Sequence, residues 1–193
     1  MEYELMISPI DAKLPFKEFS KKQAEEYFQW HMGQINHRID VLARYLKEND
    51  CKIVFDYSPK SLIPLWEWYE KHIVVESKGE EEYQREIQSY PEWMKEYVST
   101  TKISVTKTMK FGADIAIYFA EVVRKNSDGK IYWGYYTRPK NADSVNRPVL
   151  MGFKAGMDMN PQTIMYNCTL KSAEKSEKTR LFNAYNVWQQ YIV

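Results

Sequence analysis

The sequence SVTKTMKFGADIAIYFAEVVRK occupies residues 104–125, and the fold follows most directly from it. Its apolar side chains recur at intervals of three or four, which places them on one helical face. They are Val105, Met109, Gly112, Ala116, Phe119 and Val123, with Ile115 and Val122 widening the face. The pattern predicts a central, mostly buried helix. Gly112 is costly inside a helix, so it indicates a close approach by another element.

A second long helix is predicted to begin after Ser20. Ser20 and Gln23 have the spacing of a capping box, in which each side chain bonds a free backbone amide of the other. The helix then shows apolar residues at alternating intervals of four and three, namely Phe28, Met32, Ile35, Ile39, Leu42 and Leu46. Such a stripe packs against a neighbouring helix. The neighbour can belong to this chain or to a second copy, so the oligomeric state stays open.

The remaining elements alternate irregularly. Strands are predicted around residues 2–7, 52–57, 130–137 and 149–153, and the last two are expected to pair antiparallel after the turn signal at residues 126–129. Shorter helices are predicted after Pro59, Pro91 and Pro161 and near the C-terminus. Because the pattern does not repeat as βαβ units, it predicts a single α+β domain over residues 1–193. Its sheet should be small and mainly antiparallel.

Composition excludes several classes of protein. The 193 residues are 44% apolar and carry a net charge of +1, which excludes general disorder and gives no electrostatic reason to expect a nucleic-acid or membrane partner. The N-terminus lacks the basic start of a signal peptide, and no apolar run is long enough to span a bilayer. Cys51 and Cys168 are expected to be reduced thiols. Together these features predict a cytoplasmic protein.

The sequence contains no recognised catalytic or cofactor motif. The seven glycines are scattered without a Gly-x-Gly pair, so no nucleotide-binding loop is predicted. His31, His37 and His72 lack metal-ligand spacing and are expected at the surface or its boundary. Cys51 is expected to act as a small apolar residue. We therefore expect no metal and no cofactor, and the sequence leans against an enzyme.

One pair of carboxylates has two interpretations. Asp114 and Glu121 lie seven residues apart, on one face of the predicted central helix. Lys110 and Lys125 fall in the same stripe at i,i+4 spacing, which favours a solvated face of mixed charge. The alternative is a functional acid pair in a pocket between this helix and the 131–153 hairpin, serving a small-molecule binder or an enzyme.

Aromatic residues are abundant, with 8 Phe, 6 Trp and 15 Tyr. Some of the tyrosines must reach the surface, where Tyr and Trp are favoured at protein interfaces. The hairpin region combines aromatic and basic side chains, and the candidate binding residues there are Tyr132, Trp133, Tyr135, Arg138 and Arg147. This group predicts a protein-binding surface or a site for an acidic ligand. The other interpretation places the tyrosines at the core edge with their hydroxyls in water.

Residues 20–28, 56–62, 114–121 and 148–153, together with Trp133, resemble uncharacterised cytoplasmic proteins of Gram-positive bacteria. The layout is also similar to that of small immunity-type proteins, which neutralise toxins by binding them. This resemblance implies a non-enzymatic protein-binding module. The near-zero net charge departs from the acidic balance of many nuclease-blocking immunity proteins.

Overall fold

The computed structural model describes residues 2–11 and 13–192. The α-helices are α1 (Lys21–Glu48), α2 (Leu62–Glu70), α3 (Glu80–Gln88), α4 (Val105–Lys125), α5 (Pro161–Glu174) and α6 (Arg180–Gln189). Short 3₁₀ helices span Phe16–Glu18, Pro59–Ser61, Glu92–Tyr97 and Lys154–Gly156. The strands are β1 (Val75–Ser77), β2 (Thr101–Ile103), β3 (Tyr132–Gly134) and β4 (Val149–Met151). The predicted α+β class is confirmed, and these strands form two separate antiparallel pairs.

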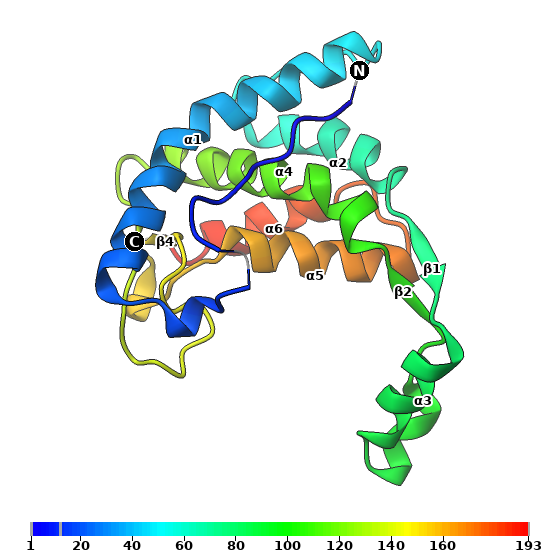
Figure 1. The fold of residues 1–193 in the computed structure, drawn as a ribbon. Coiled ribbons are helices and arrows are strands. Elements are labelled where there is room, and N and C mark those ends of the chain that lie inside the picture. The colour runs from blue at the N-terminus through cyan, green and yellow to red at the C-terminus, as the bar shows by residue number, and fades with distance from the viewer. Residues whose placement is uncertain (1, 12, 193) are drawn as a thin grey trace.

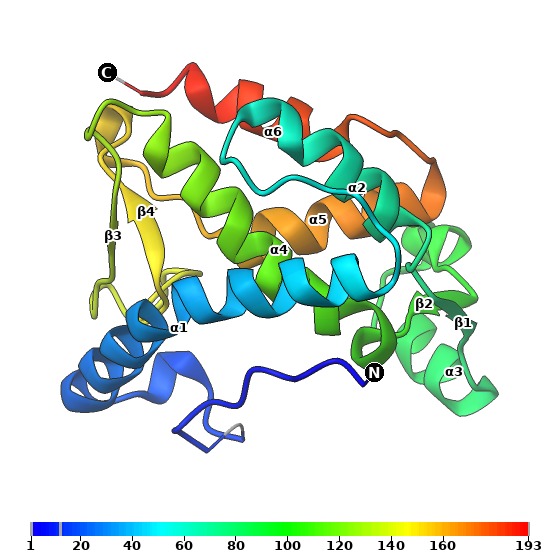
Figure 2. The same ribbon diagram turned by 90° about the horizontal axis from the view of Figure 1, so that it is seen from above.

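Helix α4 is the centre of the structure, as its apolar pattern predicts. Figure 2 shows it between α1 on one side and α2 and α6 on the other. Ile115, Phe119 and Val122 are completely buried. A Cβ atom on Gly112 would lie 3.1 Å from the Tyr69 hydroxyl of α2. The glycine therefore permits the close approach that its position in the sequence indicates.

Helix α1 begins and packs as predicted. Both bonds of the capping box are present, with Ser20 accepting from the Gln23 amide and Gln23 accepting from the Ser20 amide. The apolar stripe is buried from Ile35 to Leu46 and half-buried at Phe28 and Met32. Its neighbour is α4 of the same chain.

Two of the predicted strands are wrong. Residues 2–7 and 52–57 form neither helix nor strand and pair with no other strand that the structure describes, and the second run ends at Tyr57 with a φ of 60°. Each lies against helices instead: Tyr3 contacts the Phe111 ring at 4.7 Å, and Phe55 contacts the Tyr118 ring at 4.7 Å. An apolar, β-branched sequence favours extended backbone, but a strand also requires an adjacent edge with which to pair.

The strands that do form lie at opposite ends of the molecule (Figures 1 and 2). The predicted pairing of the hairpin is confirmed, with Tyr132 opposite Met151 and Gly134 opposite Val149. At the other end, β1 pairs with β2, and α3 projects beyond them. We call residues 75–103 the arm. Helix α3 contains no buried residue, whereas Ile103 at the base of the arm is buried. The outer part of the arm therefore stands apart from the core.

Candidate functional site

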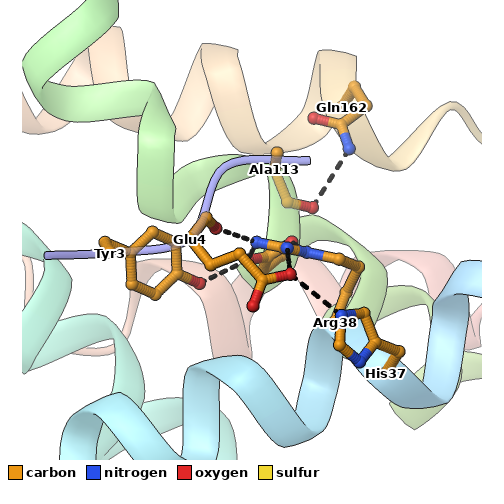
Figure 3. Close-up of polar contacts among 7 residues, drawn as sticks. Tyr3, Glu4, His37, Arg38, Ala113 and Gln162 are labelled. Carbon is orange, nitrogen blue, oxygen red and sulfur yellow. Dashed lines mark hydrogen bonds and ion pairs between the residues drawn. The ribbon is translucent and has the colours of Figure 1, made fainter. Parts of the chain in front are cut away.

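Asp114 lies in a buried ion pair. Its side chain is 0% exposed and accepts hydrogen bonds from Arg38 Nε at 2.9 Å and Nη2 at 2.7 Å. The Tyr3 hydroxyl also donates to this carboxylate. Arg38 Nη2 donates in addition to the Glu4 carbonyl at 2.6 Å, so the cluster holds the N-terminal segment against α1 and α4 (Figure 3).

This environment gives Asp114 a structural role. Burial raises the pKa of the Asp114 carboxyl, and the hydrogen bonds from Arg38 and Tyr3 oppose that rise. Burial also raises the pKa of the Tyr3 hydroxyl. The two carboxylate oxygens are both occupied by neighbouring side chains. The geometry therefore favours an anchor for the N-terminal segment over an acid–base group.

Glu121 is buried in a second cluster. It is 4% exposed and accepts from the Trp133 indole at 2.7 Å and from Arg124 Nε at 2.9 Å. The expected solvated stripe is therefore wrong for both acids, and their partners are Arg38 and Arg124 rather than Lys110 and Lys125. Helical-wheel arithmetic describes one helix, whereas the packing of other segments on α4 determines what is buried.

A cavity of about 270 Å³ does lie between α4 and the hairpin region. We call it the His31 cavity. Its walls come from the N-terminal segment, α1, α4, the hairpin region and the start of α5. The lining residues are Met6, Phe16, Tyr27, His31, Ala113, Ile117, Trp133, Arg147, Pro148, Asn160, Pro161 and Gln162. Asp114 and Glu121 are not part of this lining. Glu121 instead lines a second, more open pocket of about 280 Å³ between α1, α4 and the hairpin, together with Arg124, Tyr132 and Trp133.

His31 is the least satisfied polar group in this wall. It is 4% exposed, and neither ring nitrogen has a hydrogen-bond partner. The imidazole stacks on Tyr27 with ring centroids 6.3 Å apart and meets the Trp133 ring edge-on at 5.4 Å. Burial lowers the pKa of His31 to about 4, so the ring is neutral at pH 7. The expectation that His31 lies at the surface or its boundary is wrong.

Arg147 supplies the cation of the cavity. Its Cζ atom lies 4.1 Å from the centre of the Phe16 ring, and its side chain is half-buried. Among the acids that the structure describes, none forms a salt bridge with it. Burial lowers the pKa of the Arg147 guanidinium, which remains charged at neutral pH.

The start of α5 closes another side of the cavity. Asn160 Oδ1 accepts from the backbone amides of Gln162 at 3.1 Å and Thr163 at 3.2 Å. Gln162 Nε2 donates to the Ala113 carbonyl at 3.1 Å, which joins α5 to α4 (Figure 3). The first amides of α5 are therefore already bonded within the protein.

The five binding residues predicted from the sequence do not form one patch. Trp133 and Arg147 line the cavity. Tyr135 packs on Phe28 with ring centroids 4.8 Å apart. Tyr132, which is 56% exposed, and Arg138 lie at the surface. Tyr132 also lines the second pocket beside Trp133, so these two adjacent residues share one wall there.

Sequence reasoning missed Phe16, Tyr27 and His31 as site residues. A signal was present, because Tyr27 and His31 are four residues apart on α1 and share a face beside the apolar stripe. The sequence does not show that this face lies beside a cavity. Phe16 is in a short 3₁₀ helix of the N-terminal segment, and its sequence gives no comparable signal.

Two further findings concern metal sites and membrane-spanning helices. Within residues 2–11 and 13–192, no group of three or more His, Cys, Asp or Glu side chains is placed to hold a metal ion. In the same part of the chain, every helix is too short or too polar to cross a membrane.

Comparison with protein-family models, with curated proteins and with solved structures gives no match for this chain. The candidate site therefore rests on its own geometry.

Proposed function

We propose that this chain binds a small molecule in the His31 cavity. The observation that carries the proposal is the buried imidazole of His31, whose two nitrogens lack partners in a wall of the cavity. A buried polar group without a hydrogen bond costs about 1–3 kcal/mol. Neighbouring side chains cover both nitrogens, so a ligand with a hydroxyl or amide group would supply the missing bond once those side chains shift to admit it.

The size and lining of the cavity support this proposal. Ligand sites are concave and mostly apolar, with a few polar groups that orient the ligand. A dry cavity of about 150 Å³ holds benzene, and the His31 cavity has about 270 Å³. It therefore has room for a ring with short substituents.

The lining favours binding over catalysis. A general base is commonly oriented by a second group, and a nucleophile needs a base within hydrogen-bond reach. His31 has no such orienting partner, and the lining that the structure describes contains no Asp, Glu or Cys. We therefore propose a binding protein rather than an enzyme.

The test uses 4-ethylphenol, a neutral ring with one hydroxyl. Titration of the ¹⁵N-labelled protein should shift the Trp133 indole signal and raise the melting temperature. Ala113→Leu extends a side chain from α4 into the cavity and should abolish both effects. Ala43→Leu, at a half-buried alanine of α1 outside the lining, is the matched control. No indole shift in the wild type with either 4-ethylphenol or 4-hydroxyphenylacetate, or an unchanged shift in Ala113→Leu, contradicts the proposal.

A second proposal concerns the exposed pair Tyr132 and Arg138. The exposure of Tyr132 favours a protein contact on the hairpin, and the resemblance to immunity-type proteins makes a toxin the candidate partner. Tyr132→Ala should weaken capture of that toxin, whereas Tyr135→Ala should act mainly on stability because Tyr135 packs on Phe28. Equal capture by wild type and Tyr132→Ala contradicts this proposal.

We also propose that the protein works in the cytoplasm. Cys51 and Cys168 are both free thiols, and free thiols are typical of a reducing compartment. Localisation of the full chain by microscopy tests this proposal directly.

A further inference from the structure

We infer that the ligand of the His31 cavity is a small aromatic carboxylic acid whose carboxylate binds Arg147. The inference rests on the proposed function and names the chemistry of the ligand. It follows from three features of the lining: an unpaired guanidinium, a helix start with no free amides, and a continuous aromatic wall.

The charge of the cavity lining favours a ligand with one negatively charged group. Arg147 is its cation, and the lining residues described by the structure include no acid that would neutralise it. A partly buried charge without a partner is unfavourable, and a bound anion removes that cost. The planar guanidinium presents paired N–H donors that match the two oxygens of a carboxylate.

The start of α5 disfavours a phosphate. Helix N-termini bind phosphate through free backbone amides, but Asn160 already bonds the amides of Gln162 and Thr163. Pro161, the first residue of the helix, has no N–H. A dianionic phosphate would meet one guanidinium and a neutral imidazole, whereas a carboxylate matches the single positive charge.

Aromatic side chains form a continuous series of contacts between Arg147 and His31. Arg147 lies over Phe16, the Phe16 ring meets Tyr27 edge-on at 5.0 Å, and the Tyr27 ring stacks on His31 at 6.3 Å. Trp133 also contacts His31. Rings favour stacked or edge-on contacts with other rings. The ligand therefore has an aromatic ring between a carboxylate at Arg147 and a hydroxyl at His31.

The experiment compares 4-hydroxyphenylacetate with 4-ethylphenol, which has similar length but no charge. The wild type should bind the acid about tenfold more tightly, as expected for a hydrogen-bonded charge pair. Arg147→Gln should remove this preference, measured as the ratio of the two affinities within the same variant, because Arg147 lines the cavity and its replacement can alter both affinities. Arg138→Gln changes an exposed arginine outside the cavity and should keep the full preference. If Arg147→Gln does not fold, Arg147→Lys should reduce the preference, because lysine keeps the charge but loses the paired donors.

The outcomes separate the inference from the proposed function. Equal affinity for the two probes, or an unchanged preference in the Arg147 variant that folds, overturns the carboxylate inference and leaves small-molecule binding intact. Tighter binding of phenyl phosphate than of 4-hydroxyphenylacetate also overturns it, in favour of a phosphate. Failure of both phenols to bind the wild type overturns the proposed function itself.

Discussion

Asp114 and Arg38 form a buried ion pair that links α4 to α1. Removing one partner of a buried ion pair leaves the other charge buried without compensation, which costs about 3–5 kcal/mol. We therefore expect Asp114→Asn to lower the free energy of unfolding by about that amount, measured by urea denaturation. Glu4→Gln is the control, because Glu4 Oε1 contacts Arg38 from an exposed position at 3.3 Å, where solvent screens the ion pair and its loss should have little effect. Equal losses in the two variants would contradict the anchoring role of Asp114.

His31 should make stability depend on pH. Its pKa is about 4 in the folded protein and about 6.5 in an unfolded chain. The unfolded state therefore binds more protons between these values, so stability is lost as pH falls from about 6.5 to about 4. The loss attributable to His31 amounts to about 3 kcal/mol.

The measurement is the free energy of unfolding at pH 7, 5.5 and 4.5, for wild type and His31→Gln. The variant should show a smaller decrease over this range. His37→Gln, at an exposed histidine of the same helix, should keep most of the wild-type decrease. Parallel curves for wild type and His31→Gln would exclude His31 as the cause.

The sequence predicts the burial of apolar side chains well and the burial of polar side chains poorly. Ile35 and Leu42 are buried as their spacing indicates, but Asp114 and His31 are buried against the expectation from their polarity. The partner of Asp114 is 76 positions away in the sequence, and no local pattern reveals such a pairing. The spacing of two polar residues did give one indication. His31 and Arg38 are seven residues apart, so they share one face of α1 and can be buried together.

Among the elements, the arm is the most separable. Lys78 N–H donates to the Thr100 carbonyl at 2.8 Å, directly beyond the paired ends of β1 and β2. A two-residue Asn-Gly turn is suited to joining strands at such a position. We expect replacement of residues 79–99 by Asn-Gly to leave a cooperatively folded protein, because α3 buries none of its side chains.

Thermal unfolding followed by circular dichroism checks this prediction, and the melting temperature should change by only a few degrees. Titration with 4-ethylphenol serves as the functional control, since the cavity lining includes no arm residue that the structure describes. Loss of the cooperative transition would mean that the arm contributes to the core.

The long helices can be predicted from the sequence more accurately than the strands. The α1 and α4 ranges follow from caps and apolar periodicity, which are local properties of the chain. Residues 2–7 and 52–57 are predicted to be strands, yet they form none. Strand formation depends on a partner that the local sequence does not specify.

For the whole molecule, the α+β class follows from the irregular order of elements, whereas the binding cavity does not follow from any single stretch. Its walls come from segments as distant as Met6 and Gln162. The sequence predicts a pocket with two acids between the central helix and the hairpin. Glu121 lines a pocket there while bonded to Arg124, whereas Asp114 is held by Arg38, a pairing that the sequence could not show.

The projecting arm also divides the electric charge of the molecule. Residues 75–103 contain seven acids and four bases, a net charge of −3, which leaves +4 on the remainder of a chain whose total is +1. The protein therefore carries a dipole directed from its tip towards its body, although it is close to neutral overall. Near a charged surface it will turn the two ends in opposite directions, and the cationic end is the one that attracts small anions from solution.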